Sequence, residues 1–262
     1  MTMAEKFGGM EVHKAARAIG ITFTEDAVPE SKFVDNGSVP YAEMSASGLA
    51  GVCATANTRE AIFAAFRRKE VYATTGPRIA VRFYGGFAFK PADARAKDIA
   101  SVGYAKGVPM GGDLTRAPRG RAPSFLVHVA KDRFGANLDR VQIVKGWLGA
   151  DGKARERVYD IAWSGDRQPG ADGKLPAVCS SVDLASGTYA NTLCAAQLAV
   201  VWRDPDFDPT QRAFYYVRAL QIPTPRHTLY DALALKREHP ARPPAVLQER
   251  AYTSAIWYAP TE

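Results

Sequence analysis

The histidines of this chain are the first residues to consider for metal chemistry. The four of them are far apart in the sequence, at His13, His128, His227 and His239. A catalytic metal site needs imidazole and carboxylate ligands that converge, and a local motif would place two of them close together on one helix or strand. No pair of these histidines has that spacing. The sequence therefore predicts no metal-ligand motif in this chain.

An acidic run is the second candidate. Asp204, Asp206 and Asp208 alternate with other residues in the segment Asp-Pro-Asp-Phe-Asp-Pro. An EF-hand calcium loop requires glycine at its sixth position and glutamate at its twelfth, where this chain has Pro209 and Tyr215. A calcium site of another kind stays open, but we prefer a proline-stiffened acidic turn between two strands.

Two further motifs lack the context that their chemistry requires. Gly111-Gly112-Asp113 has neither the lysine nor the strand-to-helix setting of a phosphate-binding loop, so it predicts a tight turn. Ser45 and Ser47 precede a glycine, but the chain has no Gly-x-Ser-x-Gly nucleophile elbow and offers no partner base for either serine. No catalytic residue is therefore assigned.

The segment Thr-Thr-Gly-Pro-Arg at 74–78 is the most suggestive cluster for ligand binding. If the residues before it form a barrel strand, Thr75 lies at the carboxyl end of that strand, where barrel active sites are found. Arg78 would then hold an anionic group through its planar guanidinium. The simpler interpretation is that the hydroxyls bond to the turn backbone and the arginine pairs with a carboxylate. Both interpretations stay open, and we prefer the simpler one.

A helix followed by strands must position this cluster. Asn57 is predicted as the N-cap, and Glu60 as its partner in a capping box, so a helix is expected over 57–70. The β-branched and aromatic residues of 71–75 predict a strand that stops at a Gly-Pro pair, and 79–84 predict another. This order is typical of the closing unit of an α/β barrel or sheet.

The rest of the chain is rich in predicted strands. They cover 125–130, 140–147, 155–163, 194–202, 213–220 and 251–258. Asp151-Gly152 is a two-residue hairpin signal that joins the second of these strands to the third. We expect an irregular segment over 25–47, a weak helix over 13–19 and a surface connection over 237–244.

The expected fold class is therefore α+β and mostly β. The closing helix–strand unit of an incomplete α/β barrel precedes a β-sandwich-like domain. We place an irregular N-terminal segment and the barrel remnant at 1–86, and a β-rich C-terminal domain at 87–262. Trp147, Trp163 and Trp202 fall in strands and are expected to pack in the core.

Composition excludes several classes of protein. The chain has 262 residues, of which 47% are hydrophobic, so there is ample material for a core. The net charge of +7 comes from scattered basic residues rather than a stripe with aromatic platforms, so we expect no nucleic-acid partner. No apolar run approaches the roughly 20 residues of a membrane span. The first nine residues lack a secretory signal, which predicts a cytoplasmic protein if this start is authentic.

Several long motifs, in order, resemble domain of unknown function family 3604. They are Gly-Leu-Ala-Gly-Val (48–52), Asn-Thr-Arg-Glu-Ala-Ile-Phe (57–63), Tyr-Ala-Thr-Thr-Gly-Pro-Arg-Ile (72–79), Gly-Val-Pro-Met-Gly-Gly-Asp-Leu (107–114), Asp-Pro-Asp-Phe-Asp-Pro (204–209), Ala-Phe-Tyr-Tyr-Val-Arg (213–218) and Glu-Arg-Ala-Tyr-Thr-Ser-Ala-Ile-Trp-Tyr (249–258). The resemblance runs from about Tyr41 to the end, and the first forty residues match poorly.

This resemblance implies a relationship to the PHP (polymerase and histidinol phosphatase) metallohydrolases, whose distorted α/β barrel holds divalent metals. The His-x-His and Asp-x-His motifs of the family are absent here, so no metal ligand is carried over and no cofactor is expected in this chain. Full-length relatives are expected to bind divalent metals, to act on an ester or phosphoester substrate, and to be secreted or periplasmic in some cases.

Two functions from different classes follow. The first is the C-terminal portion of a PHP-like metal-dependent hydrolase, inactive alone because the metal-ligand motifs are absent. The second is a non-catalytic β-sandwich module for binding or assembly.

The resemblance also implies a disulfide between Cys179 and Cys194. Both cysteines stand where the family pattern usually has glycine, and two cysteines that appear together at such positions are predicted to pair. Mass spectrometry of the unreduced protein is expected to show the loss of two hydrogens and a peptide that links both residues. Recovery of both as free thiols would contradict the pairing.

Overall fold

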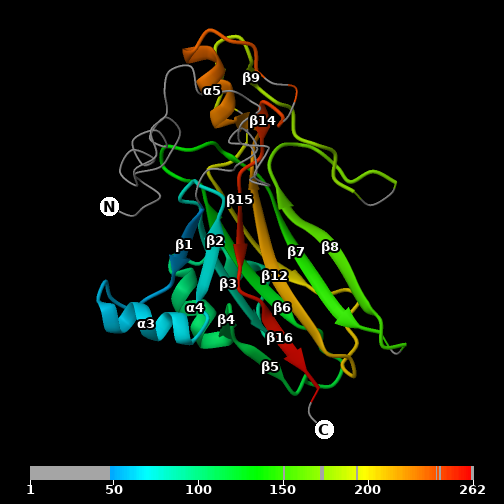
Figure 1. Ribbon diagram of the computed structural model, residues 1–262. Helices are drawn as coiled ribbons and strands as arrows, with labels where there is room; N and C mark the ends of the chain where they lie inside the picture. Colours follow the sequence, from blue (N-terminus) through cyan, green and yellow to red (C-terminus); the bar gives the residue numbers. More distant parts are fainter. Residues whose placement is uncertain are drawn as a thin grey trace.

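The computed structural model describes residues 48–149, 151–171, 174–192, 194–239, 241 and 243–260. His13, Ser45 and Ser47 lie outside these residues, as do the helix expected over 13–19 and the irregular segment expected over 25–47. In the described part of the chain, two large β-sheets pack face to face as a sandwich, and short helices lie around them (Figure 1).

The larger sheet forms one face of the sandwich. Within the described residues its eight strands are β1 (Leu49–Val52), β2 (Val71–Thr74), β5 (Asp113–Thr115), β7 (Leu138–Leu148), β8 (Ala154–Trp163), β12 (Ala213–Gln221), β15 (Arg250–Thr253) and β16 (Ile256–Ala259). β12 pairs with β7 along one edge and with β15 and β16 in succession along the other. It is therefore the central strand on which the sheet is assembled.

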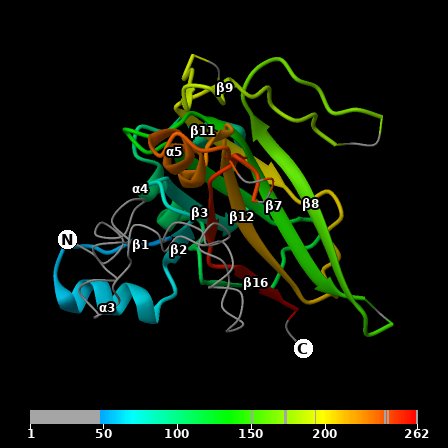
Figure 2. The same cartoon turned by 45° about the horizontal axis from the view of Figure 1, so that its top comes forward.

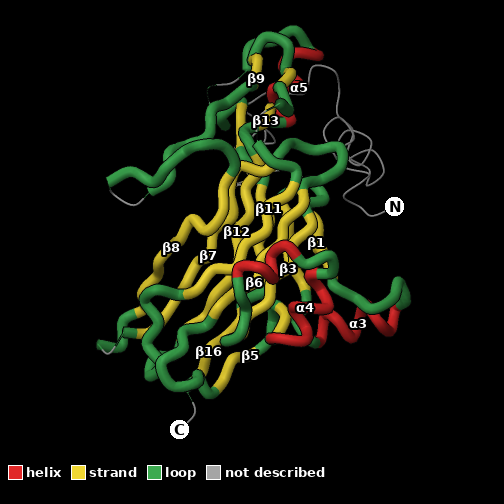
Figure 3. The backbone as a smooth tube through the Cα atoms, turned by 180° about the vertical axis from the view of Figure 1, so that it is seen from behind, coloured by secondary structure: helices red, strands yellow, loops and turns green. Residues whose placement is uncertain are grey.

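The smaller sheet lies behind it. Its described strands are β3 (Ala80–Gly86), β4 (Val108–Pro109), β6 (Ser124–Ala130) and β11 (Gln197–Arg203), in the order β11-β6-β3-β4. Two short antiparallel pairs stand apart from both sheets: β9 (Val182–Asp183) with β10 (Thr188–Tyr189), and β13 (Thr224–Pro225) with β14 (Val246–Leu247). The view from behind shows α4 (Ile99–Lys106) crossing in front of the smaller sheet beside β3 (Figure 3).

The other described helices lie around the two sheets, with the 3-10 turn η3 (Pro91–Arg95) packed on β11 and β6 of the smaller sheet. The others are α3 (Arg59–Arg67) and α5 (His227–Ala234). α5 lies with β13 and β14 beyond the end of β15, where the rotated view brings it forward (Figure 2). No helix among the described residues combines the length and the apolar character needed to cross a membrane.

Most strands and the helix α3 agree with the sequence predictions. The predicted hairpin is confirmed, since β7 and β8 pair antiparallel on either side of the Asp151-Gly152 turn. The N-cap of α3 was predicted one residue too early: the side chain that accepts the Ala61 amide belongs to Thr58 rather than Asn57. The single strand predicted over 251–258 is two strands, because the chain leaves β12 at Ser254 and rejoins it at Ile256.

The helix–strand unit has a different setting from the one expected. β2 pairs antiparallel with β1 on one side and with β15 on the other, whereas the strands of an α/β barrel run parallel. The described residues contain no closed barrel and are mostly β. Strands from both sides of the expected boundary at 86 share both sheets, since β2 pairs with β15 and β3 pairs with β6.

The core between the sheets is built by strand alternation. Along β12, alternate residues are buried, so Tyr215, Val217 and Ala219 point inward while Phe214 and Tyr216 point outward. The ring of Tyr215 reaches Phe125 of the smaller sheet, with centroids 4.5 Å apart. Trp147 and Trp202 are partly buried and pack against the same core, and Trp163 is half-buried.

A buried ion pair crosses this core. The Lys145 ammonium donates hydrogen bonds to the Asp204 carboxylate (2.6 Å) and to the Asp206 carbonyl (2.7 Å), and the Tyr215 hydroxyl donates to Asp204 (2.7 Å). The side chains of Lys145 and Asp204 are 4% and 0% exposed. The acidic run is therefore the turn between β11 and β12, as preferred from the sequence, and its first carboxylate anchors the turn to β7.

We expect Asp204→Asn to destabilise the fold strongly. The substitution preserves size but leaves the buried Lys145 ammonium without a counter-charge, which costs about 3–5 kcal/mol of the free energy of unfolding. Urea denaturation measures the loss. Arg155→Met, which removes an exposed ion pair with Asp151, is the matched control and is expected to change little. A loss in Asp204→Asn no larger than in the control would contradict the role of the pair.

Candidate functional site

A cavity of about 500 Å³ opens where the larger sheet meets α5. Its walls come from the end of β2, from β15 and the residues before it, and from the segment that carries β13, β14 and α5. The lining residues are Thr75, Pro225, Arg226, His227, Tyr230, Leu247, Gln248, Glu249, Arg250 and Tyr252. This volume lies in the range of small-molecule sites, which run from roughly 300 to 1,000 Å³.

A short hydrogen-bond circuit fixes one corner of this cavity. The Thr75 amide donates to the Arg250 carbonyl (3.0 Å), and the Arg250 amide donates back to the Thr75 hydroxyl oxygen (2.9 Å). The Thr75 hydroxyl in turn donates to the Glu249 carboxylate. These bonds continue the pairing of β2 with β15, so the sheet register itself aims the Glu249 side chain into the wall.

The carboxyl group of Glu249 binds its proton more tightly than an exposed glutamate does. Burial raises its pKa, and the Thr75 hydroxyl and the charges of Arg250 and Arg226 only partly oppose this effect. Burial in the cavity wall therefore disfavours the negative charge of Glu249.

Two arginines, Arg250 and Arg226, also line the cavity. The Arg250 guanidinium is held by the Gln248 carbonyl (3.2 Å) and the Tyr252 hydroxyl (3.4 Å). Arg226 and His227 stand at the start of α5, where backbone amides carry partial positive charge. Burial, then the neighbouring Arg226, lowers the pKa of His227, which favours a neutral imidazole.

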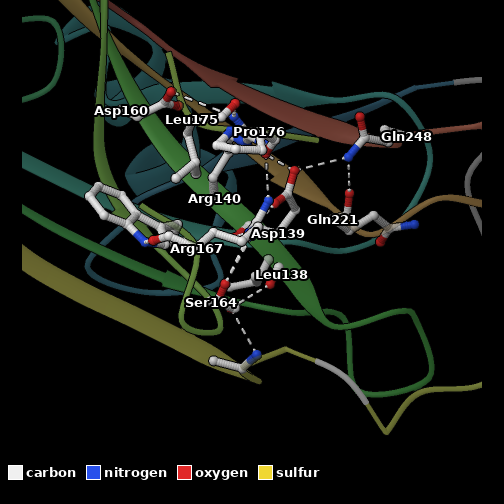
Figure 4. A network of polar contacts seen from close by, with 12 residues as sticks. Leu138, Asp139, Arg140, Asp160, Ser164, Arg167, Leu175, Pro176, Gln221 and Gln248 are labelled. Atoms are coloured by element: carbon white, nitrogen blue, oxygen red, sulfur yellow. Dashed lines mark hydrogen bonds and ion pairs between the residues drawn. The ribbon is translucent and has the colours of Figure 1, made fainter. Parts of the chain in front are cut away.

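The back wall of the cavity rests on a buried polar network (Figure 4). The Gln248 side-chain amide donates to the Asp139 carboxylate (3.1 Å) and to the Gln221 carbonyl (3.1 Å). Asp139 also accepts from Arg140 (3.0 Å) and from Arg167 (2.6 Å). The residues just before β15 are thereby tied to β7, to the end of β12 and to the loop that follows β8.

The donor set for a catalytic metal does not fit this cavity. Among the described residues that line it, Glu249 and His227 are the potential metal ligands, whereas a catalytic site commonly uses three protein ligands. Elsewhere in the described ranges no group of three His, Cys, Asp or Glu side chains comes together. His128 contacts Gln197, and His239 contacts Thr228. We therefore derive no step through a metal.

The structure separates the residues singled out in the sequence. Thr75 lines the cavity, but Arg78 is exposed and does not, and its backbone amide donates to the Asp132 carboxylate (2.7 Å). Cys179 is exposed and Cys194 half-buried, and both are free thiols here, so their pairing stays a prediction. Cys194 has a φ of 75°, a conformation that favours glycine, in keeping with its place at a glycine position of the family pattern.

Sequence reasoning did not assign Arg226, His227, Glu249, Arg250 or Tyr252. The last three belong to the motif Glu-Arg-Ala-Tyr at 249–252, which carried the resemblance but has no recognisable catalytic spacing. The first two belong to a Pro-Arg-His segment before a helix that was not predicted. A concentration of charged and aromatic residues in these two segments was the available signal.

The fold and the cavity define a β-sandwich protein with a cavity that two arginines help to line. The chain belongs to the family of proteins of unknown function DUF3604, whose model matches residues 5–260. The family match thus covers nearly all of the first forty residues, where the motifs predicted a poor match. Comparison with curated proteins and comparison with solved structures give no match.

We expect the stability of the protein to depend on pH through Glu249. Because its folded pKa is raised, the folded state binds more protons than the unfolded state between the two pKa values, so stability falls as pH rises from about 4.3 through the raised folded pKa. The glutamine of the Glu249→Gln variant does not titrate, so the stability of that variant does not fall with rising pH for this reason. Urea denaturation between about pH 4 and pH 7 is expected to show the variant gaining stability relative to the unmodified protein. Glu238→Gln, at an exposed carboxyl, is the control, and a difference that stays constant with pH would contradict the assignment.

Proposed function

We propose that the cavity beside α5 binds a small anionic molecule. The observation that carries this proposal is the charge of its lining: two guanidinium groups, Arg226 and Arg250, share the cavity with a carboxyl group of raised pKa. When Glu249 is protonated, the cavity carries an excess of positive charge. An anion that enters would replace the Glu249 charge as the partner of both arginines.

The shape of the cavity supports an organic anion over a bare inorganic ion. Pro225, Tyr230, Leu247 and Tyr252 supply apolar surface next to the charged groups. Small-molecule sites commonly combine such walls with a few convergent polar groups. The ligand is therefore expected to carry a carboxylate, sulfate or phosphate on an organic body.

We further propose that this ligand is the ester or phosphoester substrate of a PHP-like metal-dependent hydrolase. The ordered family motifs support this reading, and so does a cavity that favours anions. The raised pKa of Glu249 and the lowered pKa of His227 support a role for both groups in proton exchange with a bound ligand. The described residues offer no donor set for metals, so we propose that this chain alone binds its ligand without hydrolysing it.

The second candidate, a non-catalytic binding or assembly module, is supported by the same cavity. It differs from the first in its relation to metals. The test mixes this chain with a protein that carries the His-x-His and Asp-x-His motifs and adds manganese or zinc. Hydrolysis of an ester or phosphoester in this mixture is expected only if the chain is part of a PHP-like hydrolase. Binding of the anion is common to both.

Isothermal titration with phenyl phosphate tests the cavity directly. The unmodified protein is expected to bind phenyl phosphate and not the neutral benzyl alcohol. Arg226→Met and Arg250→Met each remove one charge and are expected to weaken binding at least about tenfold, equivalent to about 1.4 kcal/mol.

Arg203→Met, at an exposed arginine of the smaller sheet, is the control for the total charge of the protein. It is expected to leave the affinity unchanged. Equal binding of phenyl phosphate by all three variants, or equal binding of the neutral alcohol, would contradict an anion site in this cavity.

A further inference from the structure

Four aromatic rings form a row on the outer face of the larger sheet. Trp257 contacts Phe214 (centroids 5.1 Å apart), Phe214 lies beside Tyr216 (6.5 Å), and Tyr216 lies beside Tyr252 (6.4 Å). We call these four residues the aromatic row. Tyr252 also lines the cavity, so the row and the cavity form one continuous surface.

The two central rings lie flat on the sheet. A Cβ placed on Gly146 of the neighbouring strand would be 2.2 Å from Cζ of Phe214, so that ring covers the glycine. Val144, opposite Tyr216 in the register, is fully buried although it points to the outer face. The planes of Phe214 and Tyr216 differ by 11°. The rings therefore present their faces, rather than their edges, to a ligand.

The rings at the two ends of the row are tilted, and one of them is exposed. Trp257 is 49% exposed, and its ring is inclined by 46° to that of Phe214. Tyr252 is inclined by 44° to Tyr216. Two flat rings between two inclined ones make a shallow platform, and contiguous apolar surface of this kind is typical of interaction sites.

Polar side chains beside the row both donate and accept hydrogen bonds. Arg218 donates to Gln142 (2.7 Å), and Gln142 donates to Asp160 (2.8 Å), in a ladder across three strands. Glu156 stands opposite Gly146 in the register. Burial is the main cause that raises the pKa of Tyr216, and the charge of Glu156 is the second cause, so the Glu156 carboxylate lies near the row.

This mixture favours sugars as the occupant. The faces of aromatic rings carry negative charge and attract the weakly positive C–H groups of a sugar ring. The Glu156 and Asp160 carboxylates accept hydrogen bonds from hydroxyl groups, and a sugar ring carries several of these. Beyond Tyr252, the guanidinium groups of Arg250 and Arg226 add positive charge at the cavity.

We propose that the ligand of this protein is an acidic saccharide. Its anionic group occupies the cavity at Arg226 and Arg250, and adjoining sugar rings stack on Tyr252, Tyr216, Phe214 and Trp257. The placement of the anionic group rests on the anion site proposed above for the cavity. The aromatic row supports the placement of the sugar rings independently of that site.

Isothermal titration of the full chain distinguishes the parts of the ligand. The titrants are tetragalacturonate, a chondroitin sulfate tetrasaccharide, the monosaccharide galacturonate, neutral cellotetraose and a tetranucleotide of thymidylate. At least one acidic tetrasaccharide is expected to bind about tenfold or more tightly than galacturonate and than cellotetraose. Tighter binding of the chondroitin sulfate tetrasaccharide than of tetragalacturonate would favour a sulfate as the anionic group, because only the former carries one.

Trp257→Ala is expected to remove the advantage of the tetrasaccharide over galacturonate while phenyl phosphate still binds as before. Phe134→Ala, at a ring that is 85% exposed in another loop, is the control and is expected to change neither affinity. Because Trp257 is half-exposed, the Trp257→Ala variant is expected to fold. Circular dichroism of each variant checks this.

Three results would overturn the saccharide assignment. They are equal affinity for tetrasaccharide and monosaccharide, unchanged tetrasaccharide binding in Trp257→Ala, and tighter binding of the tetranucleotide than of either acidic tetrasaccharide. If phenyl phosphate binds and no tetrasaccharide gains affinity, the saccharide assignment fails and the anion site stands. If phenyl phosphate does not bind, the anion site itself fails.

Discussion

The buried carboxylate of Asp139 is the constraint on which the cavity depends. Its side chain is 2% exposed, and moving such a charge out of water costs several kcal/mol unless partners compensate. Arg140, Arg167 and Gln248 supply that compensation from three different segments. Each of them is thereby held at a fixed point of the fold (Figure 4). Loss of the carboxylate would leave two guanidinium groups facing each other at the back of the cavity wall.

The central strand β12 connects this constraint to the rest of the molecule. Its inward residues, such as Tyr215, join the sandwich core and the buried Lys145–Asp204 pair. Its outward residues, Phe214 and Tyr216, lie under the proposed ligand, and its end holds Gln248 through the Gln221 carbonyl. The alternation of a single strand therefore determines the stability of the core, the flat aromatic surface and one wall of the cavity.

Local features of the sequence were sufficient to predict most of the strands, but they were not sufficient to predict the residues of the cavity. Asp151-Gly152 predicted the β7–β8 hairpin because a two-residue turn dictates its own pairing. The site depends on contacts across 174 residues, from Thr75 to Glu249, and across 109 residues, from Asp139 to Gln248. No local period records such contacts. α5 was also missed, since its start has no side-chain cap that would mark it in the sequence. The barrel expected from the family resemblance is not seen among the described residues, where β2 has antiparallel neighbours.

The most direct test of this account is a crystal structure of the protein with phenyl phosphate. The account predicts phosphate oxygens within hydrogen-bond distance of the Arg226 and Arg250 guanidinium groups, with the phenyl ring against Tyr230 or Tyr252. It also predicts that Gln248 keeps its bond to Asp139. A ligand bound elsewhere on the protein, or a cavity whose wall moves away from Asp139 when the ligand is present, would contradict it.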